Sequence, residues 1–259
     1  MSLFKVENLS ISFGGLKAVD DVSFEVERNS IFSIIGPNGS GKTTIFNLIS
    51  GIYKPDSGRI LLEGENLVGY LPDKIAKKGI ARTFQNIELF KHATVMDNLM
   101  LGRHIHMKTG VWSGATATLF GRKSRAAKEE IKNREFVEKI VDFLDLQAVR
   151  DQFVANLAYG RRKLVELGRA LALEPSILLL DEPSAGMNTE EKGDLNIWIK
   201  DIQEVYKITI LLIEHDMNMI MGISDRILAI NQGKKIVEGL PQDVQCHPEV
   251  IEAYLGEEG

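Results

Sequence analysis

Hydrophobic and polar side chains alternate along the N-terminal part of the chain. The segments "FKVENLSISF" and "VDDVSFEVE" carry an apolar side chain at nearly every second position, which is typical of strands in a sheet with one solvent-exposed face. The later segment "SGRILLEGENL" has the pattern of two short strands joined by a hairpin. We therefore predict a small antiparallel β subdomain in this part of the chain.

Four further segments are continuous apolar runs of strand length. The first, "SIFSII", ends at a glycine, and the others are "SILLLD", "ITILLIEH" and "RILAI". Such runs are typical of strands that are buried on both faces of a parallel sheet. Helical patterns separate them, among them "KTTIFNLISG" and "TEEKGDLNIWIKDIQEVY". This alternation of strands and helices predicts an α/β core with a mainly parallel sheet and crossover connections.

The middle of the chain interrupts this alternation. Apolar side chains recur at helical spacing in "EFVEKIVDFLDL", and "ANLAYGRRKLVELGRALAL" has the pattern of a second helix. The stretch from about Arg103 to Arg125 has no clean period, and we interpret it as an irregular insertion with exposed basic residues. We predict an inserted α-helical subdomain over residues 90–173, with residues 1–89 and 174–259 forming the core and the β subdomain.

Composition limits the classes of function. The chain has 259 residues, of which 44% are hydrophobic and 26% charged, as expected of a soluble globular protein. Its apolar runs are much shorter than the roughly 20 residues that span a bilayer. The segment "MSLFKVENLS" lacks the basic-then-apolar pattern of a signal peptide, so we expect a cytosolic protein. The net charge of -5 implies no general affinity for nucleic acid, and the single cysteine, Cys246, excludes an internal disulfide.

A glycine-rich loop follows the first buried run. "GPNGSGKT" matches the phosphate-binding pattern G-x-x-x-x-G-K-[ST] and lies between a predicted strand and a predicted helix. Its glycines let the backbone curl so that several N–H groups converge on an anion at the positive end of a helix dipole. Lys42 can neutralise the β- and γ-phosphates, and the Thr43 hydroxyl can ligate Mg²⁺. The residues expected to contact the nucleotide phosphates are Gly36, Pro37, Asn38, Gly39, Ser40, Gly41, Lys42, Thr43 and Thr44.

A pair of acidic residues ends another buried run. In "ILLLDEP", Asp181 and Glu182 stand at the C-terminal tip of the predicted strand, where ligands bind in parallel sheets. Asp181 is suited to holding Mg²⁺, and Glu182 to polarising an attacking water. The alternative is a solvated strand end without a chemical role, and the phosphate loop elsewhere in the chain favours the nucleotide site.

The order of these motifs resembles that of ATP-binding-cassette (ABC) ATPases. The phosphate loop, "TFQN", "LAYGR", "LLLDEP" and "LLIEHD" follow one another within about Phe13 to Asp216. The resemblance implies a P-loop NTPase fold in a single ATP-binding domain over residues 1–259, with ATP and Mg²⁺ as cofactors.

The resemblance also implies roles for single residues. Phe13 would stack on adenine, Gln85 would reach Mg²⁺ or the attacking water, and His215 would hydrogen-bond the γ-phosphate. Taken alone, Phe13 would be assigned to the core and His215 to a structural hydrogen bond. The expected Mg²⁺ ligands are Thr43, Gln85 and Asp181. The expected catalytic residues are Glu182, His215, Gln85 and Lys42.

The stretch "LAYGR" stands where ABC ATPases carry L-S-G-G-Q, a loop that opens a helix and binds the γ-phosphate held by the other subunit of a dimer. Gly160 is kept, whereas Ala158 replaces serine and loses one hydroxyl hydrogen bond, and Arg161 brings a cation that can partly compensate. We interpret the loop as functional but altered; a plain core helix is the alternative. The residues expected to contact the partner's nucleotide are Leu157, Ala158, Tyr159, Gly160 and Arg161.

Further segments narrow the resemblance to one subfamily of ABC ATPases. The chain resembles the first of the two ATP-binding subunits of bacterial branched-chain amino-acid importers in "LAYG", in "SAGMN" and in the tail "GISDRILAINQGKKIVEG…HPEVIEAYLG". Asn188 stands where most cassettes have aspartate. The resemblance places one loop at the dimer seam, with a plain loop as the alternative, and that loop consists of Ser184, Ala185, Gly186, Met187 and Asn188.

The resemblance implies an ATPase that powers amino-acid import from the inner face of the cell membrane. The expected partners are a second ABC ATPase subunit (a sister subunit or a second copy), integral membrane permease subunits and, indirectly, a periplasmic solute-binding protein, with no nucleic acid. The alternatives are a soluble ABC ATPase in cofactor assembly or translation, and a nucleotide-gated binding module without turnover. Glu182 and His215 argue against a module without turnover, and the net charge of -5 argues against a nucleic-acid clamp.

Overall fold

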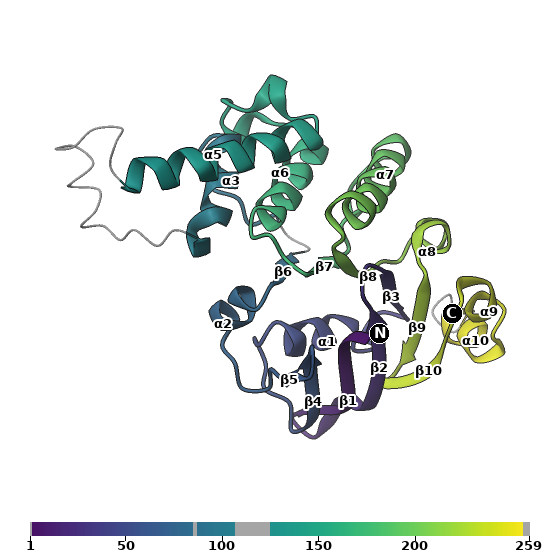
Figure 1. Ribbon diagram of the computed structural model, residues 1–259. Helices are drawn as coiled ribbons and strands as arrows, with labels where there is room; N and C mark the ends of the chain where they lie inside the picture. The colour runs from purple at the N-terminus through teal and green to yellow at the C-terminus, as the bar shows by residue number, and fades with distance from the viewer. Residues whose placement is uncertain (1, 85–86, 107–124, 256–259) are drawn as a thin grey trace. The chain divides into compact units, whose positions relative to one another are not determined.

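The alternating N-terminal segments form a four-stranded antiparallel sheet in the computed structural model, with the strand order β2-β1-β4-β5 (Figure 1). Its strands are β1 (Ser2–Phe13), β2 (Leu16–Glu27), β4 (Ser57–Leu62) and β5 (Glu65–Asn66). Phe4, Val6 and Leu9 of β1 are buried. The alternation of buried and exposed side chains along β1 is interrupted at Asn8. This residue has a positive φ of 48° and lies at an irregularity in the strand register. The predicted antiparallel β subdomain is confirmed.

The structure describes residues 2–84, 87–106 and 125–255. The chain divides into two compact units, Met1–Gln85 with Ser176–Gly259 and Asn86–Pro175. Gln85 lies outside the described residues, as does most of the predicted insertion, residues 107–124.

The four continuous apolar runs form four strands of a second, six-stranded sheet in the first unit. The strand order is β10-β9-β3-β8-β7-β6, and all neighbours are parallel except β9 and β10. The strands are β3 (Ile31–Ile35), β6 (Ile80–Thr83), β7 (Ile177–Asp181), β8 (Thr209–Ile213), β9 (Arg226–Asn231) and β10 (Lys234–Gly239). Strands β3, β7 and β8 are buried along their whole length, which confirms the predicted mainly parallel α/β core.

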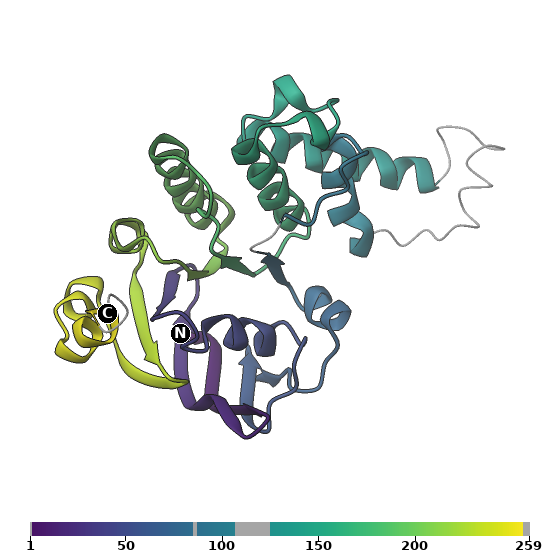
Figure 2. The same ribbon diagram turned by 180° about the vertical axis from the view of Figure 1, so that it is seen from behind.

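One apolar core joins both sheets to helix α1 (Lys42–Ile49). It includes Phe24 of β2, Phe32 of β3 and Phe46 of α1. The rings of Phe24 and Phe32 stack with their centroids 5.3 Å apart. Helix α1 lies beside the antiparallel sheet in both views (Figure 1 and Figure 2). This core fixes the start of α1 close to the end of β3, and so defines the space for the glycine-rich loop between them.

The other helices of the first unit are short except for one. They are α2 (Pro72–Lys77), α7 (Thr189–Tyr206), α8 (Met217–Ile223), α9 (Pro241–Gln245) and α10 (Pro248–Leu255). A second apolar cluster joins α8, α9 and α10 to strands β3 and β9, and it contains Ile35, Ile220, Ile227, Ala229, Val244 and Val250. The C-terminal helices are therefore packed beside the strand that leads into the glycine-rich loop.

The second unit is helical. Its elements are α3 (Val95–Gly102), η1 (Arg103–His106), α5 (Arg125–Phe143), η3 (Gln147–Val149), η4 (Val154–Asn156) and α6 (Tyr159–Leu171). Both helices predicted in the middle of the chain are present as α5 and α6. A Cβ on Gly168 would press on Leu144, Ile140 and Leu99, so a glycine at this position allows α6 to pack closely against its neighbours.

The prediction of exposed basic residues from Arg103 onward is wrong for Arg103 itself. Its side chain is buried, with Nε donating to Asn133 Oδ1 at 3.1 Å and Nη1 to the carbonyl oxygen of Ala172 at 3.0 Å. Nη1 also pairs with Glu174, and the guanidinium lies over the ring of Phe136. A buried cation is tolerated here because its hydrogen-bond donors have partners and its face is covered by an aromatic ring.

Candidate functional site

The glycine-rich loop connects the buried end of β3 to the first turn of α1. Gly36, Gly39 and Gly41 have φ values of 154°, 74° and 106°, which residues with a Cβ rarely adopt. A Cβ on Gly36 would overlap the carbonyl oxygen of Ile230, and one on Gly41 would overlap that of Ala18. The loop therefore requires glycine at two positions for reasons of space as well as conformation.

Lys42 extends its side chain back across this loop. Its Nζ donates to the carbonyl oxygens of Gly36 (2.7 Å) and Pro37 (2.8 Å). Among the described residues, the buried Ser40 Oγ has no hydrogen-bond partner, and no side chain caps the start of α1 at Gly41. A lysine, a buried hydroxyl and the N–H groups of an uncapped first turn are the donors that a phosphate group needs.

A hollow of about 160 Å³ brings this loop and the acidic motif together. It is lined by Ala18, residues 38–44 and Glu182. Glu182 directly follows β7 with a φ of 49°, a left-handed conformation that is uncommon outside glycine and concentrates at functional sites. Its Oε1 lies 2.6 Å from Nε2 of His215. The fold thus places a carboxylate and an imidazole beside the predicted phosphate site.

Asp181, at the end of β7, carries a carboxylate that is suited to Mg²⁺. It is 3% exposed, and its Oδ2 accepts a hydrogen bond from Nη2 of Arg82 at 2.7 Å. Arg82 also donates to Asn47 Oδ1 of α1 (2.8 Å) and to Oγ of Ser50, the residue after α1 (3.1 Å). Our sequence reasoning missed Arg82, although an arginine inside the short apolar segment "IART" was a usable signal. This residue connects β6, β7 and α1.

The oxygen groups of Thr43 and Asp181 fit Mg²⁺ by their chemistry, because this ion prefers oxygen ligands and usually keeps few protein ligands besides substrate phosphates. Thr43 is exposed at the loop, and Asp181 ends the neighbouring buried strand. Among the described residues, there is no group of three or more His, Cys, Asp or Glu side chains that could hold a metal ion by itself.

Glu214 is a further buried carboxylate that our sequence reasoning missed. Its Oε1 accepts a hydrogen bond from the N–H of Ser184 at 2.7 Å, and its Oε2 accepts one from the N–H of His215 at 3.0 Å. The usable signal was a glutamate at the end of the apolar run "ILLIE". Glu214 therefore fixes the backbone of His215 to the loop of residues 184–188.

In that loop, Asn188 acts locally as the N-cap of α7. Its Oδ1 accepts from the Glu191 N–H at 2.9 Å, and Glu191 Oε2 accepts from the Asn188 N–H at 3.0 Å, which is a capping box. Ser184 and Met187 are buried, Ala185 is half-buried, and Gly186 and Asn188 are exposed. Asparagine caps a helix as well as aspartate does, so the start of α7 tolerates either residue.

Phe13 lies at the exposed end of β1 and is 44% exposed. Its ring meets the ring of Tyr53 edge-on, with centroids 5.2 Å apart and an interplanar angle of 65°. Tyr53 was not predicted as a site residue, although it follows the phosphate-loop helix by only a few residues. Exposure excludes the core role for Phe13 and leaves an aromatic surface available to a flat ligand.

The segment Leu157 to Arg161 belongs to the helical unit. Ala158 stands at the N-cap of α6 without a side-chain cap bond among the described residues. Leu157 and Gly160 are buried, and Ala158, Tyr159 and Arg161 are exposed. Arg161 Nη1 donates to the carbonyl oxygen of Asp145 at 2.6 Å. The first turn of α6 thus has N–H groups without a side-chain cap, and its arginine is held by the preceding loop.

Arg162, which the sequence reasoning missed, binds the backbone just before α6. Its Nε donates to the carbonyl oxygen of Leu157 at 2.8 Å, and its Nη2 to that of Ala155 at 2.7 Å. Two consecutive arginines therefore fix the backbone ahead of α6 by bonds to carbonyl oxygens.

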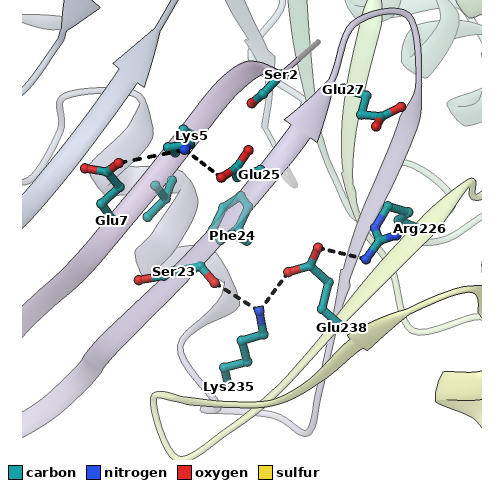
Figure 3. A pocket seen from close by; sticks show the side chains of 11 residues that line it. Ser2, Lys5, Glu7, Ser23, Phe24, Glu25, Glu27, Arg226, Lys235 and Glu238 are labelled. Atoms are coloured by element: carbon teal, nitrogen blue, oxygen red, sulfur yellow. Dashed lines mark hydrogen bonds and ion pairs between the residues drawn. The ribbon is translucent and has the colours of Figure 1, made fainter. Parts of the chain in front are cut away.

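A larger hollow, of about 520 Å³, lies between β1 and β2 on one side and β9 and β10 on the other (Figure 3). Its three cations are each paired with a carboxylate: Lys5 contacts Glu25 at 2.6 Å, and Lys235 contacts Glu238 at 2.8 Å. Arg226 also approaches Glu238, at 3.3 Å. A surface whose cations are already paired with carboxylates has little to offer a phosphate, so the smaller hollow at the glycine loop is the better candidate.

A glycine loop between a buried parallel strand and a helix, with acidic residues at the tip of another strand of the same sheet, defines a P-loop nucleotide-binding protein. No helix in the described part of the chain is long and apolar enough to cross a membrane.

The family model described as "ABC transporter" matches residues 19–185, and the one described as "Branched-chain amino acid ATP-binding cassette transporter" matches residues 234–259. The chain belongs to the ABC transporter family and is an ATPase of that family.

Known proteins support this assignment along the whole chain. The "High-affinity branched-chain amino acid transport ATP-binding protein BraF" of Pseudomonas aeruginosa is 41% identical over 255 residues, covering 98% of each chain. The corresponding LivG protein of Escherichia coli is 42% identical over 258 residues, again covering 98% of each chain. A solved structure, the ADP conformation of an ATP-binding cassette of an ABC transporter, is similar with a TM-score of 0.84 and 34% identity over 99% of both chains.

Proposed function

We propose that this chain is the ATP-hydrolysing subunit of an importer of branched-chain amino acids. The observation that carries the proposal is the hollow in which the phosphate loop meets Glu182, with His215 bonded to that carboxylate at 2.6 Å. The names of the relatives point to the solute, because two proteins at 41% and 42% identity are named for high-affinity transport of branched-chain amino acids.

In this proposal the loop of residues 36–44 binds the phosphates of ATP. Lys42 now bonds two carbonyl oxygens of its own loop, and phosphate oxygens would replace them as stronger, charged acceptors. Thr43, Asp181 and Gln85 would hold Mg²⁺, which neutralises charge on the β- and γ-phosphate oxygens when it is bound. Phe13 would stack on the adenine ring.

Glu182 would polarise the attacking water from the edge of the hollow. His215 holds the Glu182 carboxylate through Nε2, and with ATP bound it would hydrogen-bond the γ-phosphate. Glu214 anchors the backbone N–H of His215, so it would limit how far the imidazole can move. Hydrolysis then depends on positioned groups of this chain and on charge stabilisation of the phosphates.

A second ABC ATPase subunit would complete the site. Residues 157–161 would contact the nucleotide held by that subunit, and residues 184–188 would lie at the seam between the two. The unit Asn86–Pro175 would be the helical subdomain that carries the contact loop. Integral membrane permease subunits would bind the pair at the inner face of the cell membrane, and a periplasmic solute-binding protein would deliver the amino acid to them.

Reconstitution tests this proposal. The chain is co-expressed with a second ABC ATPase subunit and with integral membrane permease subunits from the same organism, and the purified complex is placed in proteoliposomes with the solute-binding protein. We expect ATP-dependent uptake of radiolabelled leucine, and no uptake when Glu182→Gln replaces the wild-type chain. Failure to co-purify with any integral membrane protein would contradict a transport role, and uptake of another solute class but not of leucine would contradict the proposed substrate.

A further inference from the structure

The hydroxyl group of Tyr254 connects the C-terminal helix α10 to the first residue of the phosphate loop. The backbone N–H of Gly36 donates a hydrogen bond to Tyr254 Oη at 2.9 Å. The two residues are 218 positions apart in the sequence. The contact therefore depends on the packing of the C-terminal helices onto the sheet.

Gly36 needs an acceptor at this point because it is buried and has left the ladder of the sheet. Strand β3 pairs with β9 up to Ile35, which lies opposite Ala229. Gly36 is the next residue and begins the loop. Buried backbone N–H groups are nearly always paired, and one without an acceptor is costly. Tyr254 supplies an acceptor where the neighbouring strand no longer does.

Tyr254 is itself held in place by the core beneath α10. Its ring packs against the cluster that contains Ile35 and Ile227 of the sheet and Val250 of its own helix. Val250 is buried, so the helix is anchored one turn before the tyrosine. A ring fixed in this way presents its hydroxyl at a defined position. Helix α10 lies within residues 234–259, the segment matched by the branched-chain family model.

Gly36 is thus held from two sides. Its N–H is bonded to Tyr254, and its carbonyl oxygen accepts a hydrogen bond from Lys42 Nζ at 2.7 Å. When phosphates bind, phosphate oxygens would replace this carbonyl oxygen as acceptors for the lysine ammonium group. The bond to Tyr254 uses an N–H at the exit of the strand, so it can persist in the bound state and keep the start of the loop in its binding shape.

We propose that Tyr254 is a positioning residue for the phosphate loop, through which helix α10 raises the affinity for nucleotide. This inference rests on nucleotide binding at residues 36–44, and it does not depend on the transported solute. Tyr254 acts on the loop through the Gly36 peptide and has no part in the chemical step. Its effect should therefore fall on nucleotide affinity and KM, with kcat at saturating ATP close to the wild-type value.

The test is the Tyr254→Phe variant, which removes the hydroxyl and keeps the ring in the core. We expect the Kd for Mg·ATP, and for ADP in EDTA, to rise about 3- to 10-fold, because without the bond the free loop leaves its binding shape more often, and the energy of one hydrogen bond limits that shift. Amide hydrogen exchange at Gly36 should become faster by a similar factor. The matched control is Tyr70→Phe, which removes a hydroxyl that donates to Glu65 Oε1 at 2.9 Å and should change neither quantity.

The outcomes separate this inference from the proposed function. Unchanged Kd values in Tyr254→Phe would overturn the inference, whether or not thermal stability falls, because Tyr254 would then be a core residue only. Unchanged exchange at Gly36 would also overturn it, because the bond would not restrain that peptide. If the wild-type chain itself binds no ATP, the proposed function fails first, and the inference fails with it.

Discussion

Replacing Arg82 with methionine removes the positive charge from a buried ion pair and keeps an unbranched side chain in its place. The side chains of Arg82 and Asp181 are 7% and 4% exposed, with 2.7 Å between Nη2 and Oδ2. The substitution also removes the hydrogen bonds to Asn47 and Ser50. The carboxylate of Asp181 remains buried after losing this cation, which is a larger perturbation than the loss of a surface pair.

The expected magnitude follows from this burial. Removing one partner of a buried ion pair costs about 3–5 kcal/mol, and the bonds to Asn47 and Ser50 do not add in full because they share the same guanidinium. We expect the free energy of unfolding to fall by about 4 kcal/mol. The control is Arg28→Met, which breaks the pair with Glu63. Both of those side chains are more than half exposed, at 58% and 62%, so this control should cost less than about 1 kcal/mol.

Urea denaturation in EDTA and without nucleotide measures both variants. Amide hydrogen exchange of β6 and β7 assigns the loss to the first of the two compact units. The double variant Arg82→Met with Asp181→Leu should recover much of the loss, because two apolar side chains of similar volume can replace a buried ion pair. A buried ion pair that stabilises the fold is refuted if Arg82→Met is no less stable than Arg28→Met, or if the double variant loses the sum of the two single losses.

Two further outcomes follow from the structure. The hydrogen bond from the Lys192 ammonium lowers the pKa of Asp216 below its ordinary value of 3.8. The pair therefore stabilises the fold above about pH 4, and this stabilisation disappears as the pH falls through the lowered pKa. Asp216→Asn keeps a side-chain cap on α8 and should lower the free energy of unfolding by less than about 1 kcal/mol at neutral pH. This loss should shrink as the pH falls below the ordinary value of 3.8, and a loss that stays constant in acid would contradict a charge-dependent pair. Ala158→Ser should change the ATPase rate only at protein concentrations where two subunits pair, and an equal change in a dilute monomer would contradict a contact with the partner's nucleotide.

Much of the fold could be predicted from local pattern. The runs that form β3, β7 and β8 are apolar throughout because both faces of these strands are buried. Helix α7 begins and ends with the segment predicted from its periodicity, Thr189–Tyr206. The glycine loop was also predictable, since its backbone geometry demands glycine at fixed positions.

The contacts that join distant parts of the chain could not be predicted in the same way. Arg82 pairs with Asp181 across 99 positions, and Gly36 bonds to Tyr254 across 218. Arg103 is basic and follows a helix end, so its local pattern predicts an exposed side chain. The side chain is buried instead, and it binds Asn133 of α5 and the carbonyl oxygen of Ala172 at the end of α6. Hydrophobic periodicity indicates which face of an element is buried, but it carries no information about which polar group meets another inside the fold.

The central claim is that ATP lies on the glycine loop and that Glu182 activates the water that attacks it. The most direct test measures Mg·ATP binding and steady-state hydrolysis for the wild-type chain and Glu182→Gln in the same assembled complex. We predict that Glu182→Gln binds Mg·ATP as tightly as the wild type and hydrolyses it at least about 100-fold more slowly, the lower end of what a general base contributes. Hydrolysis by Glu182→Gln at the wild-type rate would contradict the claim.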